Sequence, residues 1–386
     1  MLDRYHRRMR LCFILGTRPE IIKSAPLIFA ASEAGYAPVI IHSGQHYDTA
    51  MDGGFFQELS LPAADVRLSS GGKPYAEQVA YLLRELPGAL KELRPDAVVL
   101  QGDTVTVMAG ALAAHGLNIP IIHHEAGLRS RDQRMAEEYH RIIADHVSTL
   151  LCAPTEAAVA NLLNEGIPRE RVHLTGNAVV DAIRRFSGQA ARESSVLEKL
   201  SLAAKSYFVL TFHRAENVDD PSRFSAFLAS LERIVREHPD RRIVFPVHPR
   251  VEKRRAEFGQ AWPSAVLPIG PLGYFDMLRL LSEADLVLTD SGGLQEEAAI
   301  LGVPCVTLRD STERPETVEA GSNVVAGLAE DAVSEAVRAM RGKALDPISA
   351  YGDGFASERI IHLARGAFGV PACRAVTEKH EDTRRQ

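Results

Sequence analysis

Three carboxylates and one histidine stand where they could move protons. Asp103 and Glu125 each lie at the end of a short apolar run. If these runs are neighbouring strands of a parallel sheet, both carboxylates lie at one edge of it. Different surroundings there would give them different pKa values and separate acid and base roles. Glu137 opens a segment with helical spacing, and His213 directly follows another apolar run. The set predicts acid–base chemistry.

Each of these residues also has an ordinary structural interpretation. Asp103 could cap the helix that follows it, because a carboxylate accepts hydrogen bonds from the first N–H groups of a helix. Glu137 could form an exposed ion pair with Arg141, four residues along the same helix. A lone histidine is more often structural, but the place of His213 between a strand and Arg214 favours contact with a ligand.

Small residues follow a strand-like run in each half of the chain. The sequences GTRPE at 16–20 and DSGGLQEE at 290–297 come directly after apolar runs and open segments with helical spacing. The first N–H groups of such a helix are unpaired and lie at the positive end of its dipole, which favours phosphate. Two such turns predict two α/β domains that close on one phosphate-bearing ligand.

The elements that must position these residues alternate along the chain. Short apolar runs are separated by helical segments, which is typical of a parallel sheet covered by helices on both faces. We therefore expect an α/β protein with two Rossmann-like, doubly wound parallel-sheet domains facing each other across a cleft. The expected strands are 11–16, 37–43, 97–102, 120–125, 149–153, 172–176, 207–212, 243–247, 286–290 and 303–308.

A polar, strand-free stretch at 182–205 separates the two sets of strands. We place the first domain, which carries the acidic residues, at 1–182 and the second at 183–355. Residues 356–374 are expected to form a C-terminal helix that packs back on the first domain, and 375–386 a charged tail. A chain of 386 residues is long enough for two domains with separate cores.

The composition limits the kinds of binding partner and the cellular compartment that we expect. A formal net charge of −6 and a pI near 6.2 argue against binding to nucleic acid or to a membrane surface. No apolar run approaches the roughly 18 residues of a membrane span, and no signal-peptide pattern precedes the first strand. The cysteines lack paired spacing, so Cys12, Cys152 and Cys305 are expected to be free buried thiols. We expect a cytoplasmic protein.

Some motifs are missing from the sequence. No Gly-x-Gly-x-x-Gly follows the first expected strand, so NAD-dependent sugar chemistry is not indicated. No Gly-x-x-x-x-Gly-Lys-Ser/Thr occurs, so phosphoryl transfer from ATP is not indicated either. No histidine has the spacing of a zinc site with Cys or Glu. We expect no cofactor and no metal.

Together the motifs resemble those of one family, the non-hydrolysing UDP-N-acetylglucosamine 2-epimerases, whose two-domain architecture is called GT-B. They stand in family order and cover residues 11–365. The motifs are GTRPEIIK (16–23), GQHYD (44–48), QGDT (101–104), EAGLRS (125–130), TGNAVVD (175–181), HRAENVD (213–219), DSGGLQEE (290–297), RDSTERPE (309–316) and YGDG (351–354).

The resemblance implies an isomerase that interconverts UDP-N-acetylglucosamine and UDP-N-acetylmannosamine without a cofactor. In that reaction the C2 proton is removed while UDP leaves C1. UDP then re-adds to the 2-acetamidoglucal intermediate, and a proton is delivered to the other face. By similarity the catalytic residues are Asp103, Glu125, Glu137 and His213.

The resemblance also implies that the second domain holds UDP, with an arginine closing over it from the first. By similarity the binding residues are Arg18, His248, Met277, Ser291, Gly292, Gly293, Glu297 and Arg314. The helix N-terminus at 291–293 would take phosphate, and Glu297 would accept from ribose hydroxyls. Met277 stands where an aromatic residue that stacks on uracil is expected. A homodimer and a role in polysaccharide biosynthesis are further expectations from the family.

At four other positions the chain departs from the usual family pattern. Ala136 replaces a proline at the helix entry, and His140 replaces an asparagine near the proposed acid Glu137. His124 stands where valine is usual. Many bacterial members carry a second arginine at the position of Ala215, where it serves an activating UDP-N-acetylglucosamine molecule. We therefore expect substrate activation to be absent or weakened.

Several alternative functions fit parts of this pattern. The same mechanism could act on a related UDP-sugar, such as a 2,3-diacetamido-uronate, because the altered 136–140 segment could reshape the sugar pocket. A hydrolysing 2-epimerase would release N-acetylmannosamine and UDP. A GT-B glycosyltransferase or a non-catalytic nucleotide-sugar sensor would share the fold alone. A transferase would not exchange solvent hydrogen into C2, and the full set of acids and histidine argues against a sensor.

Overall fold

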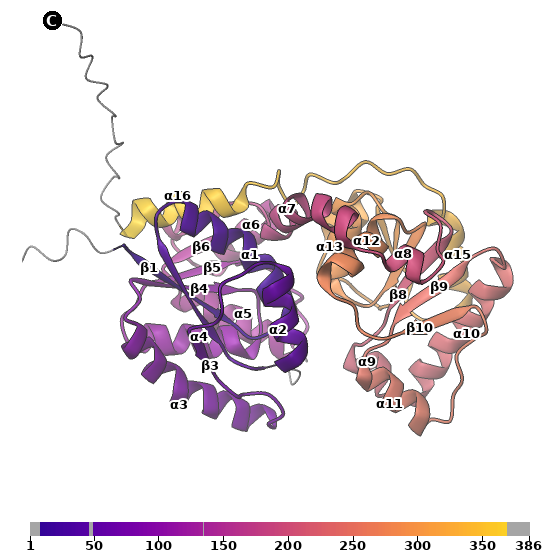
Figure 1. Cartoon of the computed structure of the whole chain (residues 1–386), viewed down its shortest axis with the longest axis horizontal. Helices are drawn as coiled ribbons and strands as arrows, with labels where there is room; N and C mark the ends of the chain where they lie inside the picture. The colour runs from indigo at the N-terminus through magenta and orange to yellow at the C-terminus, as the bar shows by residue number, and fades with distance from the viewer. Residues whose placement is uncertain (1–7, 46–48, 134, 369–386) are drawn as a thin grey trace, which may run out of the picture.

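The computed structural model describes residues 8–45, 49–133 and 135–368, which form two parallel β-sheets flanked by helices (Figure 1). In sheet order, the first sheet comprises β3 (Val66–Arg67), β2 (Ala37–His42), β1 (Arg10–Leu15), β4 (Ala97–Gln101), β5 (Ile121–His124), β6 (Leu150–Ala153) and β7 (Val172–Leu174). The second comprises β10 (Val266–Ile269), β9 (Arg242–Pro246), β8 (Tyr207–Thr211), β11 (Leu286–Thr289), β12 (Cys305–Thr307) and β13 (Asn323–Val325).

Both sheets follow the same doubly wound path. The chain starts at a central strand, moves outward on one side and then crosses to the other side. The crossover points lie between β1 and β4 in the first sheet and between β8 and β11 in the second. Ligands of such sheets bind beyond the carboxyl ends of the strands at these points. The predicted α/β class with two Rossmann-like parallel sheets is confirmed.

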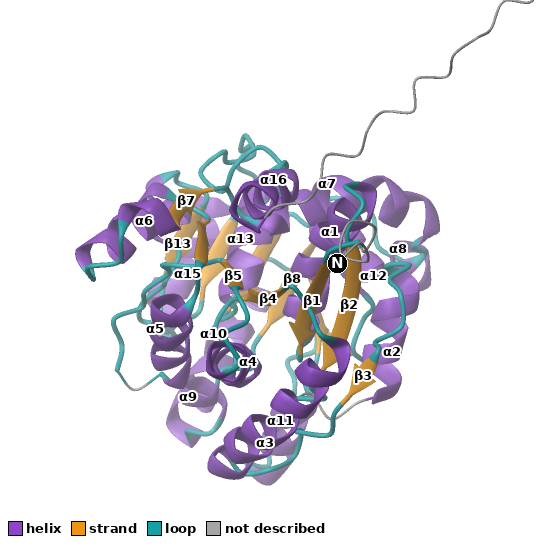
Figure 2. Cartoon of the chain, turned by 90° about the vertical axis from the view of Figure 1, so that its left-hand side faces the viewer, coloured by secondary structure: helices purple, strands orange, loops and turns teal. Residues whose placement is uncertain are grey.

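Helices cover both faces of the first sheet (Figure 2). Leu11 and Phe13 of β1 pack toward one set of helices, while Cys12 and Ile14 pack toward the other. This alternation is the two-residue period of a strand buried on both faces. The helices of this half are α1 (Arg18–Glu33), α2 (Thr49–Glu58), α3 (Tyr75–Leu93), α4 (Val105–Gly116), α5 (Ala136–Val147), α6 (Glu156–Asn164) and α7 (Ala178–Glu193), with a short 3₁₀ turn at Arg169–Arg171.

The second sheet has its own core, in which Phe208, Phe227 and Phe245 are fully buried. The helices around it are α8 (Val196–Lys199), α9 (Ala215–Val218), α10 (Pro221–Glu237), α11 (Pro249–Glu257), α12 (Tyr274–Ser282), α13 (Gly292–Ile300), α14 (Pro315–Glu319) and α15 (Glu330–Met340). The last described helix, α16 (Ala356–Phe368), packs against α1 and α7.

The two halves are joined by packing around α7 and α12. Tyr274 and Phe275 of α12 belong to the same apolar cluster as Phe55 of α2 and Phe186 of α7. The carboxylate of Glu58, at the end of α2, accepts hydrogen bonds from the N–H groups of Tyr274 (2.9 Å) and Phe275 (2.7 Å). A residue of the first half therefore caps a helix of the second.

Each of the expected strands is present, with ends that differ by one or two residues. The sequence analysis missed β3, β10 and β13, which are three of the four edge strands of the two sheets; the fourth, β7, was predicted. An edge strand pairs on one side only, so it needs no continuous apolar run and leaves a weaker pattern.

Some expectations fall outside the described residues. These are His46–Asp48 of the GQHYD motif, residues 369–374 of the expected C-terminal helix and the charged tail 375–386. Cys12, Cys152 and Cys305 are buried and free, as predicted. Within the described parts of the chain, no helix combines the length and the apolar character that crossing a bilayer requires.

Candidate active site at the strand ends

Asp103 lies just beyond the carboxyl end of β4. Gly102 turns the chain with a φ of 77°, and the Asp103 carboxylate, one-third exposed, forms an ion pair with Arg141 of α5. The capping interpretation of Asp103 is wrong, because Thr104 caps α4 by accepting from the N–H of Val107 (3.3 Å). Asp103 is therefore held by α5 and remains partly exposed at the crossover point.

A buried glutamate ties this turn to the turn after β1. Glu20 accepts from the N–H of Gly16 (2.8 Å) with one oxygen and from Thr104 Oγ1 (2.7 Å) with the other. Burial raises the pKa of Glu20 to about 7, although these hydrogen bonds partly oppose that rise. The GTRPE and QGDT segments are thus fixed next to each other.

Glu125 is buried in a left-handed backbone conformation, with a φ of 62°. Its carboxylate accepts from Lys23 Nζ (2.5 Å), Asn177 Nδ2 (2.8 Å) and the amide of Gln101. Burial alone would raise the pKa of Glu125, but Lys23 and Arg314 outweigh it and lower the pKa to about 2. In this state Glu125 is an ionised partner of Lys23 and a weak base.

The same lysine reaches the second half of the chain. Lys23 Nζ lies 2.9 Å from Oε2 of Glu296, whose Oε1 lies 2.5 Å from Nε of Arg314. Asn177 Nδ2 also donates to Glu296 (3.2 Å). Burial would lower the pKa of Lys23, but the two carboxylates raise it above its usual range. The result is a buried ionic cluster shared by both halves.

Helix α5 presents the third predicted acid. Glu137, in its first turn, is half-buried, and it lies close enough to His140 to favour the charged imidazolium. The exposed Glu137–Arg141 pair is not what the structure shows, because Arg141 is buried and pairs with Asp103 and Glu138. Asp103 and Glu137 both lie close enough to the His140 ring to act on its charge, whereas Glu125 is held in a separate ionic cluster.

His213 stands beyond the end of β8, on the second sheet. Its Nδ1 lies 3.2 Å from the buried carboxylate of Asp290, which also accepts from the N–H groups of His213 and Arg214. Burial raises the pKa of Asp290, but the hydrogen bonds from His213 and the two N–H groups prevail and lower it. The carboxylate stays ionised and orients the ring, which is 41% exposed.

A second histidine lies beside the first. The ring centroids of His213 and His248 are 6.2 Å apart, and His248 Nδ1 accepts from the N–H of Arg250 at the start of α11 (3.1 Å). Partial desolvation, then the nearby His213 and Arg18, lower the pKa of His248. Arg18, at the start of α1, therefore approaches the histidines from the other half of the chain.

Ser291, Gly292 and Gly293 form the turn into α13. A Cβ on Gly292 would lie 2.4 Å from an oxygen of Glu313, so a larger residue there would require the Glu313 side chain, which pairs with Arg309, to move. A Cβ on Gly293 would meet no atom closer than Ser291 Oγ at 3.9 Å. The Ser291 side chain does not cap the helix. The free helix N-terminus suits a phosphate.

The remaining predicted binding residues flank this turn. Glu297, one turn into α13, is half-buried, and burial raises its pKa to about 7 although Lys23 opposes the rise. Arg314 is buried and forms an ion pair with Glu296. Met277 in α12 packs against the apolar core of the second sheet. Among the residues that the structure describes, no group of three or more His, Cys, Asp or Glu could hold a metal.

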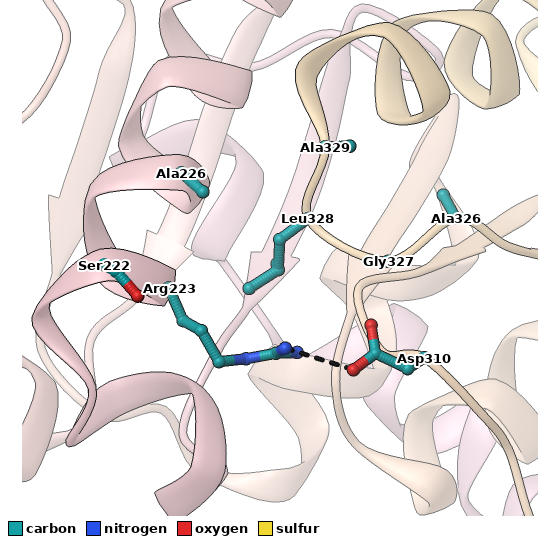
Figure 3. A pocket seen from close by; sticks show the side chains of 8 residues that line it. All are labelled: Ser222, Arg223, Ala226, Asp310, Ala326, Gly327, Leu328 and Ala329. Carbon is teal, nitrogen blue, oxygen red and sulfur yellow. Dashed lines mark hydrogen bonds and ion pairs between the residues drawn. The ribbon is translucent and has the colours of Figure 1, made fainter.

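A surface pocket of about 420 Å³ lies elsewhere, between α10 and the segment 326–329 (Figure 3). Arg223 points across it to Asp310, with 3.0 Å between the paired atoms. The same guanidinium donates to Asn217, whose amide donates to Asp290 (3.3 Å). No predicted site residue lines this pocket, and its connection to the site is the hydrogen-bond chain from Arg223 through Asn217 to Asp290.

The sequence model of the family described as UDP-N-acetylglucosamine 2-epimerase matches residues 30–365. The chain belongs to this family. It is an isomerase family. A curated UDP-N-acetylglucosamine 2-epimerase from Methanocaldococcus jannaschii is 44% identical over 361 residues, which are 92% of this chain and 98% of the relative.

Two further comparisons bear on the site. The crystal structure of the Methanocaldococcus jannaschii epimerase in complex with UDP-GlcNAc and UDP matches with a TM-score of 0.88, covering 93% of this chain and all of that one. The UDP-2,3-diacetamido-2,3-dideoxy-D-glucuronate 2-epimerase of Pseudomonas aeruginosa is 39% identical over 92% of this chain and 100% of its own length. The family's two-domain GT-B architecture is that of this chain.

Sequence reasoning about this epimerase-family site missed four polar residues that organise it. They are Lys23, Asn177, Asp290 and Glu296. Each lies inside a quoted motif, so the motifs themselves were the available signal. Their partners lie far away in sequence, and spacing alone could not pair them.

Proposed function

We propose that this protein interconverts UDP-N-acetylglucosamine and UDP-N-acetylmannosamine by elimination and re-addition of UDP. The observation that carries the proposal is the position of Asp103 at the crossover point of the first sheet, where it is ion-paired with Arg141 and, like Glu137, acts on the His140 ring. The relative whose structure contains UDP-GlcNAc and UDP supports the choice of substrate.

The chemistry needs proton transfer on both faces of C2. The C2 proton is not next to a carbonyl group, so its removal must be coupled to the departure of UDP from C1. One group takes the proton from one face, and another delivers a proton to the opposite face. Asp103 and Glu137 are our candidates for these two tasks. Glu137 lies in the first turn of α5, Asp103 is paired with Arg141 of the same helix, and neither belongs to the ionic cluster of Lys23.

We also propose Glu125 as a catalytic residue, but only after its contact with Lys23 has changed. Its pKa of about 2 makes it a poor proton acceptor while Lys23 is bound to it. Substrate must therefore reorganise the Lys23 contact before Glu125 can take a proton. Until then its ionised carboxylate holds the lysine at the junction of the two domains.

The departing diphosphate requires positive charge and N–H donors. We assign this task to the N-terminus of α13 at Ser291, Gly292 and Gly293, with Arg18 and His248 nearby. His213, oriented by Asp290 through Nδ1, can present Nε2 to the leaving oxygen. Glu297 and Met277 are our candidates for the ribose and the uracil.

A second candidate keeps the mechanism and changes the sugar. The Pseudomonas aeruginosa relative, 39% identical, is named for a UDP-2,3-diacetamido-2,3-dideoxy-D-glucuronate. Purified protein should be given each UDP-sugar, with product formation followed by proton NMR of the anomeric signals. The proposal expects a kcat/KM for UDP-N-acetylglucosamine at least tenfold above that for the uronate. The reverse preference would replace our substrate, and free N-acetylmannosamine as product would indicate hydrolysis.

We also propose that the enzyme works in the cytoplasm as a homodimer, contributing to polysaccharide biosynthesis, as its family resemblance suggests. Light scattering of the purified protein during gel filtration checks the dimer. A mass of one chain, 42.2 kDa, at micromolar concentration would contradict it.

A further inference from the structure

His140 connects Asp103 to another helix of the first domain. The ring is buried in α5, with its Nδ1 2.9 Å from the carbonyl oxygen of Asp103 and its Nε2 2.9 Å from the hydroxyl of Tyr75. Tyr75 is the first residue of α3, and its ring is stacked on the imidazole with 5.7 Å between centroids and 11° between planes. Three elements thus meet at one imidazole.

These contacts determine the tautomer of the histidine. A carbonyl oxygen can only accept, so Nδ1 of His140 must carry the hydrogen that it shares with Asp103. In a neutral imidazole Nε2 is then an acceptor, and the hydroxyl of Tyr75 must donate to it. The relay runs in one direction, from Tyr75 through His140 to the carbonyl of Asp103.

Asp103 is therefore held at two points from α5. His140 fixes its main chain and Arg141 its carboxylate. Arg141 is fixed in turn by Glu138 (2.9 Å), which accepts from the N–H groups of Ser130 and Arg131. Because both the carbonyl and the carboxylate of Asp103 are bound to α5, Asp103 keeps a fixed orientation relative to that helix, which also carries Glu137.

We propose that His140 and Tyr75 are positioning residues, which hold Asp103 in the orientation that proton transfer at C2 requires. This inference rests on the proposed epimerisation and goes beyond it. The usual family asparagine at this position also offers an N–H donor group and a carbonyl acceptor, so His140 can make the same connection with a group that titrates. Misplacing a reacting group by about 1 Å can cost on the order of a hundredfold in rate.

The charges around the ring give this connection a pH dependence. Burial lowers the pKa of His140, while its hydrogen bond to Asp103 and the charges of Glu137 and Asp103 raise it and Arg141 lowers it. The net shift is downward. The ring is therefore neutral near pH 7. As pH falls through its pKa, Nε2 gains a proton and Tyr75 can no longer donate to it. The hydrogen bond from the hydroxyl is then replaced by one that the imidazolium donates to that hydroxyl.

Steady-state kinetics can separate positioning from mere structural support. His140→Ala should lower kcat by about tenfold or more with UDP affinity unchanged, whereas His140→Asn should restore most of kcat. Tyr75→Phe removes the hydrogen bond that stabilises neutral His140, so the acid limb of kcat should move to higher pH. The shift should be absent when Tyr75→Phe is combined with His140→Asn. Tyr81→Phe, on the same helix, is the matched control and should leave the profile unchanged.

A readout independent of activity uses nitrogen-15 NMR of the histidine rings, with His140→Asn identifying the signal. We expect an unprotonated Nε2 at neutral pH and a higher ring pKa in Tyr75→Phe. A protonated Nε2, an unmoved acid limb in Tyr75→Phe or full kcat in His140→Ala would each overturn the proposal. If the wild-type protein does not epimerise UDP-N-acetylglucosamine at all, the proposed function fails, while the tautomer is still decided by NMR.

Discussion

Lys23 of the first domain and Glu296 of the second form a buried ion pair, with 2.9 Å between Nζ and Oε2. The same nitrogen lies 2.5 Å from Oε1 of Glu125, so one cation compensates two buried carboxylates on opposite sides of the domain junction. Lys23 therefore links the two strand edges electrostatically, in addition to the packing around α7 and α12. Breaking a buried pair is costly because it leaves an uncompensated charge.

Replacing Lys23 with methionine keeps the length of the side chain and removes the charge. The loss should lower the free energy of unfolding by about 3–5 kcal/mol, because Glu125 loses its main partner. Denaturant titration followed by circular dichroism measures this change. Lys91→Met, at an exposed position of α3, is the matched control and should change stability by less than about 0.5 kcal/mol. Equal stability of both variants would contradict the importance of the pair.

The sequence predicted the elements of the fold better than the contacts of the site. The buried run of β4 and the turns into α1 and α13 could be recognised locally, because a parallel sheet and a helix N-terminus each leave a local pattern. The pairing of Lys23 with Glu296 spans 273 residues, and no local spacing encodes it. The same holds for the contacts between α5 and Asp103. There the helical spacing suggested an exposed pair of Glu137 with Arg141, whereas Arg141 pairs with Asp103.

The buried side chain of His124 should make the free energy of unfolding depend on pH. Both of its ring nitrogens are buried without a hydrogen-bond partner among the described residues, and burial lowers its pKa to about 3. The unfolded chain takes up a proton near pH 6.5, whereas the folded chain cannot, so stability should fall by up to about 1.4 kcal/mol per pH unit below that point.

The substitution His124→Val isolates this effect. The variant should lose less stability than the wild-type protein between about pH 6.5 and pH 4.5, as measured by urea titration at each pH. His115→Val, at an exposed position of α4, serves as control and should follow the wild-type curve. Parallel curves for His124→Val and wild type would show that the buried imidazole is not responsible.

Glu297 should make UDP binding depend on pH. Its pKa of about 7 leaves the carboxyl group largely protonated on the acid side of neutrality, and the ionised form accepts ribose hydroxyls better. UDP affinity, measured by calorimetry, should therefore rise as pH increases through 7. Glu297→Gln should remove this rise, and Glu297→Ala should weaken binding by about 1–3 kcal/mol. Glu319→Gln is an exposed control. Unchanged affinity in Glu297→Ala would move the ribose contact elsewhere.

Ala215 should leave the enzyme without activation by its own substrate. It is exposed at the start of α9 and cannot supply a guanidinium to a second diphosphate, while the neighbouring Arg214 lies 3.4 Å from Glu313. The reverse reaction, started from UDP-N-acetylmannosamine alone, should show no lag and should saturate hyperbolically. A lag that traces of UDP-N-acetylglucosamine abolish would contradict this expectation.

The three carboxylates should differ from other polar residues in their effect on turnover. Asp103→Asn, Glu125→Gln and Glu137→Gln should each lower kcat by on the order of a hundredfold or more, the usual scale for a positioned acid or base. UDP affinity should change little, because these groups are assigned to the sugar. Glu156→Gln, at an exposed position of α6, is the control. Near-normal turnover in any of the three would assign that residue a structural role.

Incubation with UDP-N-acetylglucosamine in D₂O, followed by NMR at C2, tests the central claim most directly. Elimination and re-addition predict deuterium at C2 of the product and of recovered substrate, because the proton that is removed exchanges with solvent before another is delivered. Epimerised product that retains its original C2 proton would contradict the mechanism that we derive from Asp103 and Glu137.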